Sequence, residues 1–222
     1  MGLFLEYGYT SFNKIGEELC GDRVSIVKKD GYTTLVLADG LGSGVKANIL
    51  STLTSKILST MVSNEIPMEE CIETIVETLP VCKERGVAYS TFSVIHINDE
   101  GSGYMFEFDN PRCIFCTNGV FKDLEREEIT ILNKKIYKSD LKLKSGDLIL
   151  IMSDGVPHAG IGKTMNLGWD RKDIIAYLDE NIKPHMSARC VANLLASTSK
   201  ALYMNEPGDD TTVAAIKIRE EE

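Results

Sequence analysis

The stretch LVLADGLGSGVK, residues 35–46, joins an apolar run to an acidic, glycine-rich turn. The run from Thr33 to Ala38 predicts a buried strand with Asp39 at its end. Beyond the turn, apolar residues recur at every fourth position, which predicts a helix over about residues 45–62. The apolar set is Val45, Ile49, Leu53, Ile57 and Met61. Because a carboxylate is a hard oxygen ligand and glycines allow tight turns, the stretch predicts a functional site at the strand end.

Three further segments place a carboxylate at the edge of an apolar strand. The run LILIMSDG, residues 148–155, ends in Asp154-Gly155, and Asp209 and Asp210 precede a last apolar run. Asp22 follows Cys20-Gly21 at the start of another run. A single Asp-Gly pair is only a turn signal. Four acidic strand edges together predict that several strands bring carboxylates to one place.

Composition limits the class of protein. A chain of 222 residues with 43% hydrophobic residues can bury one core, and we expect a single domain over 1–222. The 33 acidic and 24 basic residues give a net charge of −9, which disfavours binding to nucleic acid or to an anionic membrane. No apolar stretch approaches the roughly 18 residues of a membrane span, and no leader peptide is recognisable. We therefore expect a cytoplasmic protein.

Hydrophobic periodicity predicts strands, two helices, strands, two helices and a final strand. The expected strands are 3–9, 22–28, 31–38, 92–97, 104–108, 114–116, 147–152 and 211–218. The expected helices are 45–62, about 67–80, a short one after Asp173, and a longer one that ends near Leu202 and that Ser187 could cap. Since strands and helices do not alternate regularly, the order favours an α+β fold with two mainly antiparallel sheets flanked by antiparallel helix pairs.

The segment from Val156 to Arg171 directly follows Asp154-Gly155 and has weak periodicity. It is either a mobile flap beside the site or an ordinary surface loop. His158 lies in it and is either a substrate contact or a surface residue. His96, which alternates within a strand, is expected to be a core or sheet-face residue.

The aspartates indicate a particular chemistry. Mg²⁺ and Mn²⁺ are bound by a few carboxylates and keep several waters. Two such ions about 3.5 to 4 Å apart can share a carboxylate and a water, and aim that water at phosphorus. A cluster made only of aspartates therefore fits hydrolysis of a phosphoester without a protein nucleophile.

These motifs also carry a family resemblance. In chain order they are Gly21-Asp22, ADGLGSG at 38–44, LKSGD at 143–147 leading to SDGV at 153–156, and DDTTV at 209–213. This order resembles the metal-dependent PPM (type 2C) serine/threonine protein phosphatases, specifically their bacterial SpoIIE-type branch. The similarity runs from about residue 15 to 218. It implies a β-sandwich flanked by helix pairs, in αββα layers.

The resemblance also implies roles for individual residues. Asp39 would bridge two Mn²⁺ or Mg²⁺ ions, and Asp22 and the backbone carbonyl of Gly40 would complete one site. Asp154 and Asp209 would complete the other, with the adjacent Asp210 as the alternative ligand. These aspartates would be the catalytic residues, because they hold the ions that activate the water.

Two features depart from the wider family. Its eukaryotic members place a histidine after the Asp-Gly of the second motif, where this chain has Leu41, as SpoIIE-like proteins have an apolar residue. The proton for the leaving group must then come from water or from another group. The family's phosphate-binding arginine is not evident either, since Arg23 follows Asp22 and is not assigned that role.

The resemblance implies a phosphoserine or phosphothreonine protein substrate in bacterial partner-switching signalling. In that branch the substrate is typically a STAS-type anti-sigma-factor antagonist. The helix pair over 45–82 is expected to be regulatory, through a homodimer or another protein. Two rival interpretations are a nucleotide-binding loop at 40–44, whose glycine spacing fits no phosphate-binding motif, and a pseudophosphatase that serves as a binding module.

Overall fold

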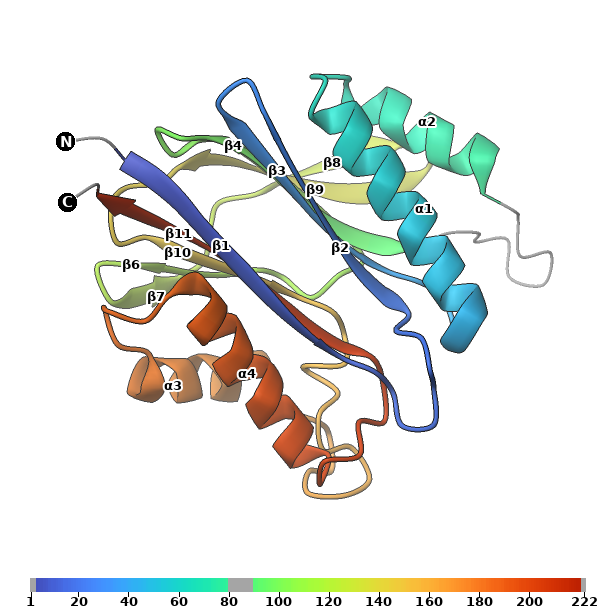
Figure 1. Ribbon diagram of the computed structural model, residues 1–222, viewed down its shortest axis with the longest axis vertical. Helices are drawn as coiled ribbons and strands as arrows, with labels where there is room; N and C mark the ends of the chain where they lie inside the picture. The colour runs from blue at the N-terminus through green and yellow to red at the C-terminus, as the bar shows by residue number, and fades with distance from the viewer. Residues whose placement is uncertain (1–2, 80–89, 221–222) are drawn as a thin grey trace. The chain divides into compact units, whose positions relative to one another are not determined.

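The computed structural model describes residues 3–79 and 90–220 of the chain (Figure 1). Among these residues, contacts define two compact units within the span predicted as one domain. Unit 1 comprises Met1–Glu18, Pro111–Leu124 and Leu143–Glu222, and unit 2 comprises Leu19–Asn110 and Glu125–Lys142. Each unit has an antiparallel sheet and a pair of helices, which confirms the predicted α+β class. No helix in the described ranges is long and apolar enough to cross a membrane.

Unit 2 is built on a sheet with the strand order β2-β3-β4-β5-β9-β8. The strands are β2 (Asp22–Lys29), β3 (Tyr32–Asp39), β4 (Thr91–Asn98), β5 (Ser102–Phe108), β8 (Glu127–Ile131) and β9 (Lys134–Lys142). Strands β2 and β3 form a hairpin at Asp30 and Gly31, whose φ angles of 51° and 77° suit a two-residue turn. This turn fixes the register of β2 on β3, in which Asp22 pairs with Asp39.

Helices α1 (Gly44–Val62) and α2 (Met68–Thr78) pack on this sheet and enclose one core cluster with it. The predicted bounds of α1 are confirmed. The predicted end of the second helix near Pro80 lies outside the described residues, although α2 itself ends at Thr78.

The buried face of α1 overlaps only the C-terminal half of the apolar stripe that predicts the helix, where Ile57 and Met61 pack against the core. Val45, Ile49 and Leu53 are 63%, 52% and 38% exposed. The buried face instead consists largely of small and hydroxyl side chains, together with Leu50, Leu58 and Val62. The small and hydroxyl residues are Gly44, Ala47, Ser51, Thr54, Ser55 and Ser59. Short side chains on this face let the helix backbone approach the strands closely.

Unit 1 is built on a sheet with the strand order β1-β11-β10-β6-β7. The strands are β1 (Leu3–Phe12), β6 (Ile114–Thr117), β7 (Val120–Lys122), β10 (Leu148–Met152) and β11 (Thr211–Glu220). Helices α3 (Arg171–Asn181) and α4 (Ala188–Leu202) complete the unit, and α4 runs beside β1 and β11 (Figure 1). As predicted, Ser187 caps α4, because its side chain accepts a hydrogen bond from the Cys190 N–H. Helix α3 begins earlier than predicted, since Asp170 is its cap.

Hydrophobic periodicity does not predict β7, β8 or β9. Strand β9 has the sequence KKIYKSDLK, in which charged residues mask the alternation, and β8 pairs only with β9 at one edge of the sheet. Only Ile136, Ser139 and Leu141 of β9 are buried. These strands form because neighbouring strands supply backbone partners, and that pairing leaves little trace in a local hydrophobic pattern.

Candidate metal centre

In unit 2, Asp22 and Asp39 lie side by side. They are direct partners in the antiparallel register of β2 on β3, so their side chains leave the same face of the sheet. Directly opposed residues have Cβ atoms about 4.5 to 5.5 Å apart, and two like charges at that spacing destabilise the pair. Asp22 is only 4% exposed, so water screens this repulsion poorly. A cation held between the carboxylates would remove the repulsion.

The turn after Asp39 is shaped by the close approach of α1. A Cβ atom on Gly40 would lie 2.0 Å from the carbonyl oxygen of Ala47, so only glycine fits here. The Gly40 N–H donates to the Gly21 carbonyl at 3.0 Å. From the next position of α1, the Asn48 side chain donates to the Cys20 carbonyl at 2.8 Å. The start of α1 therefore holds the backbone on both sides of the aspartate pair.

In unit 1, Asp154 and Asp209 come together through the pairing of β10 with β11. The ladder continues beyond β10, where the Ser153 N–H donates to the Thr212 carbonyl at 3.0 Å. A Cβ atom on Gly155 would lie 2.0 Å from the Asp210 carbonyl oxygen. Glycine at 155 thus lets the turn after Asp154 pack against the segment that carries Asp209.

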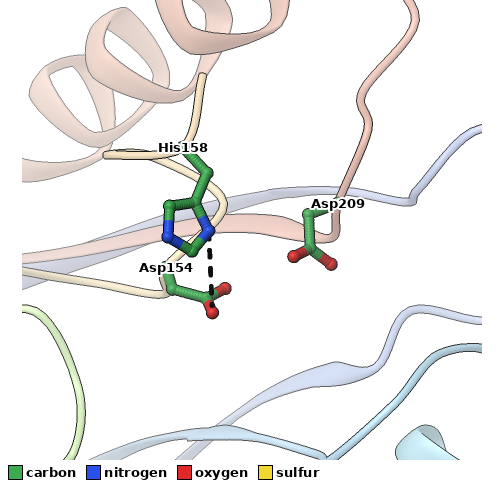
Figure 2. A group of neighbouring side chains, drawn as sticks. All are labelled: Asp154, His158 and Asp209. Atoms are coloured by element: carbon green, nitrogen blue, oxygen red, sulfur yellow. Dashed lines mark ion pairs between the residues drawn. The ribbon is translucent and has the colours of Figure 1, made fainter. Parts of the chain in front are cut away.

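The His158 side chain lies near these two carboxylates, and Figure 2 shows its contact with Asp154. One ligand atom each from Asp154, His158 and Asp209 lie within 4.8 Å of one another. The His158 Nδ1 is 3.8 Å from an Asp154 carboxylate oxygen, and the two side chains are 51% and 46% exposed. The His158 N–H donates to the Asp154 carbonyl at 3.0 Å, so one turn of backbone places both side chains. The sequence left the role of His158 open, and its spacing of four residues from Asp154 is the signal for this contact.

The electrostatics of this group favour a cation. Burial and the negative charge of Asp154 raise the pKa of Asp209. Burial and the charges of Asp209 and Asp154 also raise the pKa of Tyr203. The Tyr203 hydroxyl donates to the Gly155 carbonyl at 2.8 Å and so supports the turn. No sequence pattern pointed to Tyr203, which lies just after α4 and reaches the turn only in the folded unit.

Asp210, the alternative ligand, accepts a hydrogen bond from another segment of unit 1. It is 4% exposed, and its carboxylate accepts a hydrogen bond from the Lys14 N–H at 2.9 Å. Asp209 rather than Asp210 belongs to the group with Asp154. The side chains of Leu41 and Arg23, noted above as departures from the wider family, are both exposed.

The segment from Val156 to Arg171 contains turns and an isolated bridge between Ile161 and Met165. Contacts anchor it within unit 1: the Lys163 ammonium donates to the Tyr203 carbonyl at 3.1 Å, and the Trp169 N–H donates to the Pro157 carbonyl at 2.8 Å. Between these anchors Leu167 is 94% exposed. Its role as a flap stays a prediction.

Both carboxylate pairs fit a divalent cation. Each offers hard oxygen ligands at a strand end, and in each the negative charges lie close enough to repel one another. In unit 2 the close approach of α1 to Gly40 also holds the backbone beside Asp39 in place.

Comparison with known proteins gives the family. Residues 29–219 match the model of the SpoIIE family, described as Stage II sporulation protein E. The comparison with curated proteins gave no match.

Solved structures share the fold. The phosphatase domain of the cell fate determinant SpoIIE from Bacillus subtilis is 19% identical with a TM-score of 0.73, and the match covers 100% of this chain and 95% of that chain. The RsbU and RsbW domains of a Mycobacterium tuberculosis protein are 18% identical with a TM-score of 0.73, and the match covers 100% of this chain but 61% of that one.

A third structure contains metal. The catalytic domain of the serine/threonine protein phosphatase PstP, solved with two manganese ions, is 15% identical with a TM-score of 0.61. The match covers 98% of this chain and 100% of that chain. Because the family model covers most of the sequence, the chain belongs to the SpoIIE family of metal-dependent protein phosphatases with the type 2C fold.

Proposed function

We propose that this chain hydrolyses phosphoserine or phosphothreonine on a protein substrate. The proposed metal ligands are Asp22, Asp39, Asp154, Asp209 and the backbone carbonyl of Gly40. The observation that carries the proposal is that each unit folds with a pair of aspartates at the end of adjoining strands. Family membership supports the reaction class.

The residues of the chain contribute mainly by binding and positioning. Divalent cations at such oxygens supply Lewis acidity and a water that ionises near neutral pH. Asp22 and Asp39 are held by the β2–β3 hairpin, and Asp154 and Asp209 by the β10–β11 ladder. Because these ligands stand on strand ends rather than on long loops, their geometry is set before an ion binds. Leu41 carries no proton, so the leaving oxygen takes its proton from water or another group.

We further propose that the substrate belongs to a partner-switching system in the cytoplasm, where a STAS-type anti-sigma-factor antagonist would be the phosphoprotein. The similarity to a protein with RsbU and RsbW domains supports this setting. The proposed regulatory element is the helix pair over 45–82, of which residues 80–82 lie outside the described residues. Its first helix packs on Gly40, so a homodimer or regulatory protein that shifts α1 would move this ligand.

The metal-dependent hydrolysis of p-nitrophenyl phosphate tests the reaction. We expect Asp39→Asn to lower kcat/KM by at least about 100-fold, because loss of a residue that only supports a ligand already costs 10- to 100-fold. Asp30→Asn is the matched control, since it removes the same charge at the turn of the same hairpin, where asparagine tolerates the positive φ. Equal activity of Asp39→Asn and the wild type would refute the assignment. Metal binding without turnover in the wild type would instead indicate a pseudophosphatase.

A further inference from the structure

The group of Asp154, His158 and Asp209 contains a nitrogen ligand that the aspartate motifs do not account for (Figure 2). The backbone positions the imidazole, because the His158 N–H donates to the Asp154 carbonyl and the nearby Val156 and Ala159 are fully buried. The side chain itself remains about half exposed. A rigid turn therefore presents a solvent-accessible imidazole beside two carboxylates.

The spacing allows all three groups to bind one ion. Metal–ligand distances of about 2.0 to 2.2 Å put two ligands of one ion at most about 4.0 to 4.4 Å apart. The His158 Nδ1 and the Asp154 oxygen, at 3.8 Å, already satisfy this limit. The widest separation in the group is no more than 4.8 Å. Rotation of one exposed side chain closes the small difference.

We propose that His158 is the third protein ligand of the cation held by Asp154 and Asp209, and that it makes this site prefer a first-row transition ion over Mg²⁺. Mg²⁺ takes oxygen ligands and water, whereas imidazole is a good ligand for transition ions. An imidazole added to two carboxylates therefore favours a transition ion more than a site made only of oxygen ligands does. The inference rests on the proposed function, because it assumes that Asp154 and Asp209 bind metal.

A structural role for the contact is a poor alternative. The pair is 3.8 Å apart and both side chains are about half exposed, so the contact adds little to stability. Within the described residues, His158 contacts Asp154 and forms backbone hydrogen bonds. Removal of its side chain should therefore leave the fold intact, and variants at this position can be compared directly.

Electron paramagnetic resonance with Mn²⁺ provides the test on the full, untagged chain. Electron spin echo envelope modulation detects nitrogen bound to Mn²⁺, and we expect a nitrogen coupling in the wild type that is absent in His158→Ala. Titration of Mn²⁺, and of Mg²⁺ in competition with it, gives both affinities. We expect His158→Ala to weaken Mn²⁺ binding by at least about tenfold and to change Mg²⁺ binding much less.

Two controls separate this inference from the proposed function. The chain has three histidines, and His185→Ala removes an exposed one outside the group and should leave both affinities and the coupling unchanged. Asp154→Asn should weaken the binding of both Mn²⁺ and Mg²⁺. Absence of a nitrogen coupling in the wild type, or an unchanged ratio of Mn²⁺ to Mg²⁺ affinity in His158→Ala, would overturn the role of His158. Unchanged binding of both ions in Asp154→Asn would overturn the proposed metal site itself.

Discussion

Two glycines take equivalent positions next to aspartates. Gly40 follows Asp39 and would place a Cβ atom 2.0 Å from Ala47 of α1, while Gly155 follows Asp154 and would place one 2.0 Å from Asp210. In both cases the chain packs against the backbone beside a proposed ligand. Glycine is required in these Asp-Gly pairs for close approach of two backbone segments, and neither residue has a positive φ. An Asp-Gly pair in the sequence does not show whether glycine is needed for close backbone approach or for a positive φ.

Gly155→Ala tests this packing. We expect the substitution to lower the free energy of unfolding by about 1 to 3 kcal/mol, because the added methyl group must push the Asp210 backbone away. It should also weaken metal binding at Asp154 and Asp209. Gly119→Asn serves as a control, since position 119 has open space and a positive φ that asparagine tolerates. Urea unfolding and metal titration measure both effects, and an alanine variant as stable as the wild type would contradict the argument.

His96 is a buried residue, as its alternation in β4 predicts. It is 3% exposed, and its Nδ1 lies 2.8 Å from the Thr34 hydroxyl. Its ring stacks on Tyr32 with centroids 4.7 Å apart. Burial lowers the pKa of His96, although the Glu65 carboxylate acts in the opposite direction. The folded protein therefore holds this imidazole neutral at a pH where the unfolded chain protonates it.

The pH dependence of stability follows from this difference. The unfolded chain binds the proton near the ordinary pKa of 6.5 and the folded chain only at a lower pH, so stability falls as the pH drops below about 6.5. We expect His96→Gln to lose stability at neutral pH but to show a shallower decline between pH 6.5 and 5. His185→Gln, at an exposed position, should keep the wild-type slope. Parallel slopes for His96→Gln and the wild type in urea unfolding would show that His96 does not contribute.

At the scale of elements, the residues that predict helix α1 are largely different from the residues whose contacts stabilise it. Its apolar stripe is exposed at Val45, Ile49 and Leu53, while the buried face combines small residues with Leu50 and Leu58. The spacing of the apolar residues indicates that a helix can form, because this spacing matches one helical turn. Which face is buried depends on the shape of the sheet beneath it.

Substitutions on the two faces of α1 should therefore differ. We expect Ile49→Gln to change the free energy of unfolding by no more than about 0.5 kcal/mol, because the side chain is 52% exposed. Leu58→Ala should cost about 2 to 5 kcal/mol, since Leu58 is fully buried in the core of unit 2. Chemical denaturation of both variants checks this order. A reversed order would mean that the stripe is covered in solution.

At the scale of the whole molecule, the excess of acidic residues and the two aspartate pairs make stability depend on cations. The net charge is −9, and the close pairs add local repulsion that a divalent ion removes. An ion that binds only the folded chain stabilises it by about 2.7 kcal/mol at a concentration 100 times its Kd.

Thermal unfolding should show this coupling. We expect Mn²⁺ or Mg²⁺ to raise the Tm of the wild type and EDTA to reverse the change. Asp39→Asn should keep only part of the increase, because one ligand is lost while Asp22, Asp154 and Asp209 remain. The increase in Tm with Ca²⁺, which forms longer bonds to more ligands, serves as the comparison for Mn²⁺ and Mg²⁺. A Tm that does not respond to divalent ions would contradict metal binding by the folded chain.

The sequence by itself determined the local parts of this molecule. The turn at Asp30-Gly31 sets the β2–β3 register, and that register places Asp22 opposite Asp39. The bounds of α1 and the cap of α4 also follow from local patterns. These features were predictable because residues close in the chain meet at small cost in loop entropy.

Tertiary structure alone decided the rest. Tyr203 reaches Gly155 only after β10 pairs with β11 and α4 packs on the same sheet. The same pairing brings Asp154 to Asp209, which the family resemblance implied but no local pattern encodes. The pairing of β8 with β9 and the buried face of α1 likewise depend on neighbouring elements. The physical reason is that these contacts join residues far apart in the chain, so their stability comes from packing and backbone pairing that no local pattern encodes.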